Sequence, residues 1–223
     1  MGLKKTNTTA VQTSSEELAN AITHGIGMLL SVWGFVILSY KAIIEGTVWH
    51  RWGIGIYGLS LCFLYLSSTC YHAIAHEKIK KIFRRLDHIS IYMFIFGCYA
   101  PITLVALHGV VGWTLLGIEC GLCLLGVLLK IYFGHRYEIF SVLFYLLMGW
   151  MAVLAIGPML TVLPLQAFLW ILVGGLCYSF GVIFYAYTRR YAYFHAIWHL
   201  FVLAGSICHF LMILFYIIPF RIS

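Results

Sequence analysis

Seven long apolar segments, separated by short polar ones, dominate the sequence. They fall at about residues 19–40, 52–72, 88–107, 110–129, 139–160, 165–188 and 194–218. Each is close to the roughly 20 residues that an α-helix needs to cross a hydrocarbon core about 30 Å thick. The pattern predicts an all-α membrane protein in which residues 19–223 form a single domain, a bundle of seven transmembrane helices.

The segment before the first span, residues 1–18, is polar and is expected to be a tail. Ser14 followed three residues later by Glu17 is typical of a capping box, which predicts a helix that starts near Ser15 and runs along the membrane surface. No short apolar core in this tail ends in a small-residue cleavage site, so we expect no cleavable signal peptide.

Composition supports a membrane location, because 63% of the residues are hydrophobic and only 9% are charged. Soluble domains are nearer a quarter charged, so this chain cannot cover itself with a polar surface. We expect a multi-pass protein of the cell membrane, and in bacteria this is the inner membrane. Membrane lipid is then its environment and its expected ligand.

Positive charge predicts the orientation. With the N-terminus inside, the inner segments hold eleven of the fourteen Lys and Arg residues, and short cytoplasmic loops carry such an excess. These eleven are Lys4, Lys5, Lys78, Lys80, Lys81, Arg84, Arg85, Lys130, Arg136, Arg189 and Arg190. The N-terminus is therefore expected in the cytoplasm and the C-terminus outside. The net charge of +7 reflects this topology and some attraction to anionic lipid, and dispersed loop charges do not indicate nucleic-acid binding.

Five polar residues are predicted to meet at one depth of the bundle. His195 and His199 lie four apart on the last span, so both imidazoles occupy one helix face, about one turn apart. Ser68 and His72 repeat this spacing near the end of the second span. Because successive spans alternate in direction, the end of the second span and the starts of the third and seventh all lie near the inner face. Asp87, at the start of the third span, joins the same layer.

These residue types suit zinc. Three neutral imidazoles, from His72, His195 and His199, leave one position open in a tetrahedral site, which is typical of catalytic zinc. Asp87 beside the metal would orient its water, accept a proton and compensate charge. Ser68, one turn deeper than His72, would donate a hydrogen bond to an oxyanion or hold a substrate carbonyl. The alternative is that His72 is an interfacial histidine and that the other two histidines are packing residues.

Asn20 and His24 open the first span at the same inner level. We expect them to contact the site or its substrate, although a capping or packing role for His24 beside the neighbouring glycines is an equal alternative. His209 follows His199 by ten residues, a rise of about 15 Å, so it cannot bind the same ion and is expected to hydrogen-bond across the bundle.

Glu119 is the acidic residue well inside a span. Burying a carboxylate there costs several kcal/mol unless it is protonated or paired, so it marks a wet cavity or a neutral acid. Its role stays open, with a place next to the substrate among the possibilities. The remaining histidines are expected to contact solvent or lipid headgroups at loops and helix ends. They are His50, His76, His88, His108 and His135.

Taken together, these residues resemble the hemolysin III family, the bacterial branch of the progestin and adiponectin receptor superfamily. The resemblance covers nearly the whole chain. Its motifs are Glu17-xx-Asn20-xx-Thr23-His24-Gly25, Ser68-xxx-His72, Leu86-Asp87-His88, Tyr99-Ala100-Pro101, and His195-xxx-His199 with His209-Phe210.

The resemblance implies a seven-helix fold with a cytoplasmic N-terminus. It also implies a zinc site formed by His72, His195 and His199, an aspartate, matching Asp87, that contacts a water on the metal, and a motif serine that matches Ser68. Related alkaline ceramidases resemble amide hydrolases that act on lipids, whereas the name of the bacterial branch refers to cell lysis.

The leading hypothesis is therefore a zinc-dependent membrane hydrolase of a lipid amide or ester, with Asp87 as the base and a site near the inner leaflet. A receptor or regulator of membrane lipid state, with structural zinc, needs the same ligands. A transporter or a haemolysin-like pore is a third possibility. A retinal protein is disfavoured because the last span has no lysine. The substrate and the oligomeric state are not predicted.

Overall fold

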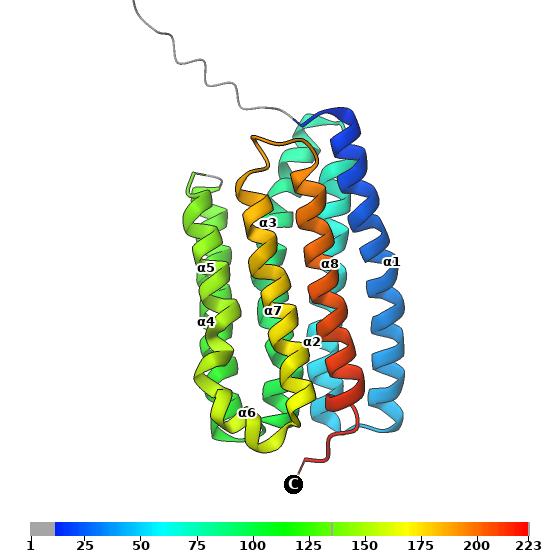
Figure 1. The fold of residues 1–223 in the computed structure, drawn as a ribbon, viewed down its shortest axis with the longest axis vertical. Coiled ribbons are helices and arrows are strands. Elements are labelled where there is room, and N and C mark those ends of the chain that lie inside the picture. The colour runs from blue at the N-terminus through cyan, green and yellow to red at the C-terminus, as the bar shows by residue number, and fades with distance from the viewer. Residues whose placement is uncertain (1–11, 135, 223) are drawn as a thin grey trace, which may run out of the picture.

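The computed structural model describes residues 12–134 and 136–222, whose regular structure is entirely helical. Lys4 and Lys5 of the charge count, most of the predicted tail, and His135 lie outside the described residues. Figure 1 shows the long helices standing side by side. In chain order the elements are α1 (Ser14–Ile44), α2 (Val48–Ala73), α3 (Glu77–Pro101), η1 (Ile102–Ala106), α4 (Val110–Phe133), α5 (Glu138–Trp150), η2 (Met151–Ala155), α6 (Ile156–Val162), α7 (Leu165–Ala186), α8 (Phe194–Met212) and η3 (Ile213–Ile217).

Seven helical segments in the described part of the chain are long and apolar enough to cross a membrane, which confirms the predicted number of spans. The helices extend beyond the apolar runs. The third span, for example, begins at Glu77 rather than near residue 88, because the basic stretch before Asp87 continues the same helix. The residues counted as an inner loop therefore form the first turns of α3.

The start of α1 differs from the prediction by one residue. Thr13 is the N-cap: its side chain accepts a hydrogen bond from the Glu16 N–H at 3.3 Å, and its own N–H donates to Glu16 Oε2 at 2.9 Å. The predicted capping pair of Ser14 and Glu17 was therefore wrong. Helix α1 begins at Ser14 inside the predicted tail and runs unbroken to Ile44. The shifted cap leaves Glu17 free to face the bundle.

Two spans contain irregular turns. The third passes through Pro101 into the π-helical turn η1, as expected where proline removes a backbone donor. The fifth is interrupted by the 3₁₀ turn η2, where the Tyr99 hydroxyl donates to the Met148 carbonyl and accepts from the Ala152 N–H, both at 2.8 Å. A side chain inserted into the hydrogen-bond ladder of a helix is a recognised cause of such a break.

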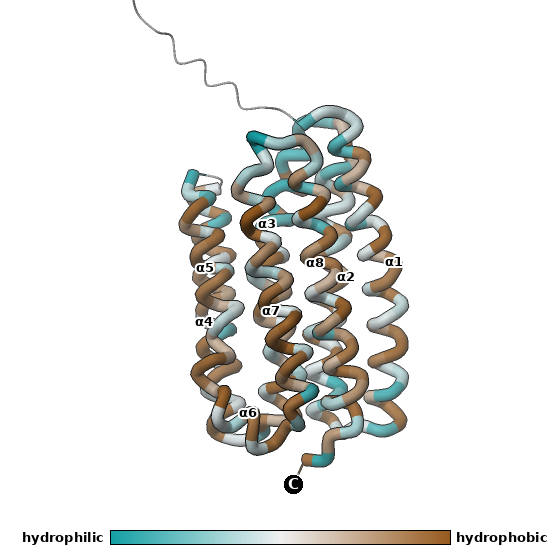
Figure 2. Tube along the Cα trace, in the orientation of Figure 1, coloured by the Kyte–Doolittle hydropathy of each residue, from teal (hydrophilic) through white to brown (hydrophobic). Residues whose placement is uncertain are grey.

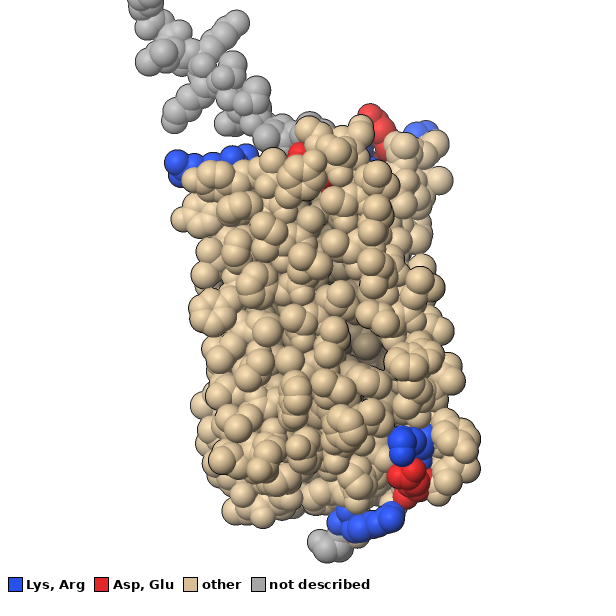
Figure 3. All heavy atoms as spheres, turned by 45° about the vertical axis from the view of Figure 1, so that its right-hand side comes forward, with Lys and Arg blue, Asp and Glu red and all other residues tan. Residues whose placement is uncertain are grey.

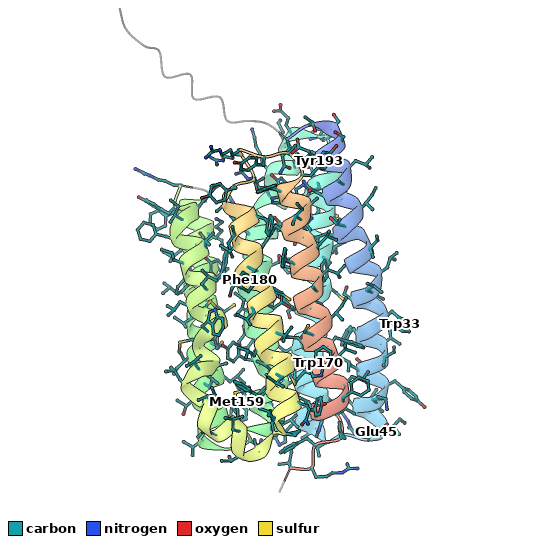
Figure 4. All side chains as sticks on the ribbon, viewed as in Figure 1. Trp33, Glu45, Met159, Trp170, Phe180 and Tyr193 are labelled. Carbon is teal, nitrogen blue, oxygen red and sulfur yellow. The ribbon has the colours of Figure 1, made fainter. Side chains whose placement is uncertain are left out.

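The bundle is apolar along its length and charged at its ends. Hydrophobic residues follow the shafts of the helices in Figure 2, and on the face shown in Figure 3 the Lys, Arg, Asp and Glu side chains gather at the two ends. Trp33 projects outward from α1 (Figure 4) and is 64% exposed. Such an apolar outer face suits lipid, in which helices satisfy their own backbone hydrogen bonds.

The spans differ in how much of their surface is buried inside the bundle. In the most apolar stretch of the third span 78% of the residues are buried, compared with 11% in the fifth. The third span therefore lies at the centre of the bundle and the fifth at its edge. We use the term inner end for the end of the bundle at which α1 and α8 begin, which the charge bias assigns to the cytoplasm. The C-terminus lies at the opposite end (Figure 1).

Some polar residues lie deeper than predicted. Lys130, assigned to an inner loop, is 1% exposed in the last turn of α4. His50 and His88 are buried, so the expected solvent or headgroup contact was wrong for them. His50 accepts the Thr47 N–H at Nδ1 and donates from Nε2 to the Ile217 carbonyl at 3.0 Å, which satisfies both ring nitrogens inside the bundle. His76 and His108 are exposed, as predicted.

Candidate metal centre

Three histidines from two helices converge at the inner end. His72 lies in the last turn of α2, whereas His195 and His199 occupy the first two turns of α8. The ring centroids are 4.6 Å apart for His195 and His199, 5.0 Å for His72 and His195, and 5.1 Å for His72 and His199. One ligand nitrogen from each residue lies within 4.8 Å of the others, so the group could hold a metal ion. The predicted convergence is confirmed.

A carboxylate orients His72. Its Nδ1–H donates to Glu17 Oε2 at 2.7 Å, and the other oxygen of Glu17 accepts from Lys80 Nζ at 3.0 Å. The Nε2 atom of His72 is buried and has no hydrogen-bond partner among the described residues. Metal-binding histidines commonly donate their second N–H to a carboxylate, which fixes the tautomer and the direction of the ligand atom. His72 Nε2 is thus prepared as a ligand.

Helix α1 orients His199 in a similar way. The Thr23 hydroxyl donates to the backbone carbonyls of Ala19 and Asn20, so its oxygen is left to accept a hydrogen bond. His199 Nδ1 lies 3.1 Å from this oxygen and 3.3 Å from the Asn20 carbonyl. Because both neighbours are then acceptors, Nδ1 carries the proton, and Nε2 of this buried ring is left for a metal.

His195 is held differently. It is half-buried and forms no hydrogen bond with the described residues, and its ring lies among those of His72, His199 and Tyr185. A tetrahedral zinc ion with bonds of about 2.1 Å needs nitrogens about 3.4 Å apart, and the ligand nitrogens here all lie within 4.8 Å of one another. Because the His195 ring has no hydrogen bond to hold it, it is the ring most free to adjust its position. The donor set therefore fits zinc.

Asp87 and Ser68 flank the same ring. Asp87, in α3, is partly exposed, and its carboxylate lies beside Ser68 and within electrostatic reach of His72. Ser68 is fully buried, and its hydroxyl oxygen has no hydrogen-bond partner of standard geometry among the described residues. A carboxylate and a hydroxyl thus lie close to His72 of the three-histidine group.

A fourth histidine lines the centre. His24 stacks on His199 with ring centroids 3.5 Å apart and planes inclined by 14°, and it meets the edge of Tyr65 at 5.0 Å. Both of its nitrogens are buried and lack hydrogen-bond partners in the described chain. Asn20 is also buried and donates from Nδ2 to Gln12 Oε1 at 3.0 Å. Both residues therefore lie at the centre, where the sequence placed them.

Glu17 and Thr23 were not predicted as site residues. Along α1, Glu17, Asn20 and His24 follow the i, i+3, i+7 spacing of a single helix face, and Thr23 adjoins it. A polar stripe on an otherwise apolar span was the signal that could have identified them. The direct reason for their role, contact with residues far along the chain, is visible only in three dimensions.

Two other buried polar residues do not join the centre. Glu119, in the middle of α4, is fully buried with neither carboxylate oxygen hydrogen-bonded to a described residue. Its electrostatic neighbours are Cys98 and Tyr99. His209, predicted to hydrogen-bond across the bundle, packs against Tyr178 and interacts with the backbone of Ile171 in α7, although neither ring nitrogen has a partner of standard geometry in the described part of the structure.

Comparison with known proteins gives consistent matches over nearly the full length. Residues 12–210 match the family described as haemolysin-III related. Hemolysin-3 of Bacillus cereus is 44% identical over 212 residues, which cover 95% of this chain and 96% of that protein. A hemolysin-3 homolog of Bacillus subtilis is 44% identical over 92% of this chain and 95% of its own length. The human monocyte to macrophage differentiation factor is 28% identical over 89% of this chain and 83% of its own length.

Proposed function

The chain belongs to the haemolysin-III related family of membrane proteins, and from this membership and the three-histidine group we propose that it is a zinc-dependent hydrolase of a lipid amide or ester. The observation that carries the proposal is the 2.7 Å hydrogen bond between His72 Nδ1 and Glu17. It aims an otherwise unpartnered Nε2 atom at the two histidines of α8. A purely packing histidine would not need such a carboxylate.

The zinc ligands in this proposal are His72, His195 and His199. Zinc bound there would polarise a carbonyl group and activate water towards it. His24 and Tyr65 are buried beside the centre, and His195, in the first turn of α8 at the inner end, is half-buried.

Asp87 and Ser68 would carry out the proton and hydrogen-bond steps. The carboxylate of Asp87 would take a proton from the attacking water and return it to the leaving amine or alcohol. The Ser68 hydroxyl, which lies beside the Asp87 carboxylate, would donate to the substrate oxygen as negative charge develops there. Both groups lie beside His72, so they would act on the same reacting carbonyl.

A lipid substrate is favoured by the position of the centre. His72 and His195 are in the last and first turns of their helices, at the inner end, where the amide and ester groups of the inner leaflet lie. The surrounding helices present apolar side chains that suit an acyl chain. The name of the Bacillus cereus relative refers to haemolysis, and a pore remains an outcome that the experiment below must separate from hydrolysis.

The test compares wild type with Asp87→Asn in purified, lipid-reconstituted protein, using metal analysis and a panel of ceramides and ester lipids. We expect both proteins to hold about one zinc ion per chain and turnover to fall by about 10²- to 10⁴-fold in the variant. Glu77→Gln, which changes an exposed carboxylate at the start of α3, is the matched control and should keep full turnover.

Three results would oppose the proposal. A wild type that holds zinc and cleaves no lipid in the panel would favour a regulator with structural zinc. Release of dye from intact vesicles, unchanged by Asp87→Asn, would favour a pore. Wild type purified without zinc, and unable to bind it when supplied, would remove the basis of both metal hypotheses.

A further inference from the structure

A second buried cationic site lies at the inner end, away from the histidines. Lys130 is 1% exposed, and its Nζ atom makes one hydrogen bond, to Ser141 Oγ at 3.3 Å. No carboxylate of the described residues lies within ion-pair distance of it. Glu138, a nearby acid, is already bound by Arg84 and Arg189, each at 3.1 Å.

A cavity adjoins this ammonium group. It has a volume of about 430 Å³, within the range of small-molecule pockets, and lies among α3, α4 and α5. Apart from Lys130, Ser141 and the hydroxyls of Tyr92 and Tyr137, the side chains around it are apolar or aromatic. Its aromatic walls are formed by Tyr92, Phe133, Tyr137, Phe140 and Phe144.

The lysine lacks the partners that its charge requires. An ammonium group has three N–H donors, and only one of them is used here within the described structure. An ionised side chain at membrane depth costs several kcal/mol unless it is paired. Glu138, Arg84 and Asp87 lie within electrostatic reach of Lys130, but none of the acidic oxygens is close enough for an ion pair with it. The two remaining N–H donors of Lys130 would therefore suit an anion with several acceptor oxygens.

We propose that this cavity binds the phosphate of an anionic phospholipid from the inner leaflet, with the Lys130 ammonium group as the donor and the aromatic walls against the first part of an acyl chain. Three observations select a lipid. Lys130 lies in the last turn of α4, at the end assigned to the cytoplasm, where anionic headgroups attract basic groups. Phe133 and Phe140, at the rim, are 51% and 70% exposed on the lipid-facing surface. The walls offer contact to methylene groups, which a free phosphate ion lacks.

The experiment measures the binding of phosphatidylglycerol and phosphatidylcholine to purified full-length protein, by native mass spectrometry and by thermal unfolding in defined nanodiscs. Wild type should bind phosphatidylglycerol in preference to phosphatidylcholine, and Lys130→Gln should weaken phosphatidylglycerol binding by about tenfold or more. Lys81→Gln removes an exposed charge at the same end and should leave the preference unchanged.

A second variant keeps the test decisive if Lys130→Gln does not fold. Ser141→Leu retains every charge but fills part of the cavity, and it should also reduce the preference for phosphatidylglycerol. The proposal is overturned if Lys130→Gln and Lys81→Gln lower phosphatidylglycerol binding equally, since the effect would then be general surface charge. It is also overturned if Ser141→Leu binds like wild type, or if inorganic phosphate protects the protein as well as the lipid does. Zinc content and lipid hydrolysis are not part of the readout.

Discussion

Two buried polar regions, one around the histidines at the inner end and the other along α4, differ in how their polar groups are hydrogen-bonded. Around the histidines, α1 supplies the partners: Glu17 for His72, and Thr23 with the Asn20 carbonyl for His199. On α4, Lys130 is equally buried but has one hydroxyl partner, and Glu119 has none among the described residues.

The difference indicates that the polar groups of the two regions obtain their partners in different ways. In the histidine centre the chain itself orients two of the three rings, since His72 and His199 form hydrogen bonds with α1. The α4 region holds polar groups whose partners the chain does not supply, and for Lys130 we propose a lipid. Substitutions in the first region should therefore affect metal binding strongly, whereas those in the second should have small effects or depend on lipid.

The largest effect is expected for His195→Ala. Its ring makes no hydrogen bond with the described residues, so the variant removes a proposed metal ligand with little other damage. Most bound zinc should be lost, together with the stabilisation that zinc gives the folded state, about 4 kcal/mol at a free concentration 1,000 times Kd. Metal analysis and thermal unfolding, with and without a chelator, measure both quantities.

The control for this variant is His76→Ala, which alters an exposed histidine at the same end. It should keep its zinc and its chelator-sensitive unfolding temperature. If His195→Ala also kept its zinc and its chelator-sensitive unfolding temperature, the three-histidine group would not be a zinc site. The proposed contrast between a metal-binding region and the α4 region would then be wrong.

A smaller effect is expected for Glu17→Gln. The substitution weakens the hydrogen bond that orients His72 without removing any ligand, and loss of such outer partners typically lowers metal affinity about 10- to 100-fold. Zinc titration against a competing chelator would measure the change, with Glu77→Gln as the control. Equal affinities for Glu17→Gln and wild type would mean that the chain does not prepare this ligand.

The smallest effect is expected for Glu119→Gln. No described side chain loses a hydrogen bond, the volume is nearly unchanged, and an unpaired acid is replaced by a neutral amide, so the free energy of unfolding should change by less than about 1 kcal/mol. Denaturation in detergent would measure this. A loss of several kcal/mol, or a loss of lipid turnover, would show that Glu119 has a partner or a role of its own.

Much of the fold and of the centre followed from the sequence, because both depend on simple geometry. Apolar runs of sufficient length gave the seven spans, and the alternating direction of successive spans placed His72, Asp87 and the α8 histidines at one depth. The four-residue spacing of His195 and His199 set their rings on one face. None of these steps needed knowledge of which helices are neighbours.

The features that the sequence did not predict depend on neighbours. Glu17 was assigned to a capping box. Its contact with His72 was not predicted, because the two residues are 55 positions apart in the sequence. Lys130 was counted as a loop residue, since a charge near the end of an apolar run usually lies outside the helix. Helix α4 continues to Phe133, however, and turns the lysine towards α5. His50 lies at a helix start, where only the structure reveals the Ile217 carbonyl that accepts its proton.

The bond between the first turn of α1 and the start of α8 has a consequence for biogenesis. The Tyr193 N–H, at the inner end in Figure 4, donates to Glu16 at 3.0 Å, and Thr23 meets His199 across 176 positions of sequence. Because α8 is the last span to leave the ribosome, the nascent chain cannot assemble the three-histidine group until translation is almost complete. Metal binding would thus indicate that insertion of the last span has finished. A product terminated before residue 195 would reach the bilayer without a complete three-histidine group.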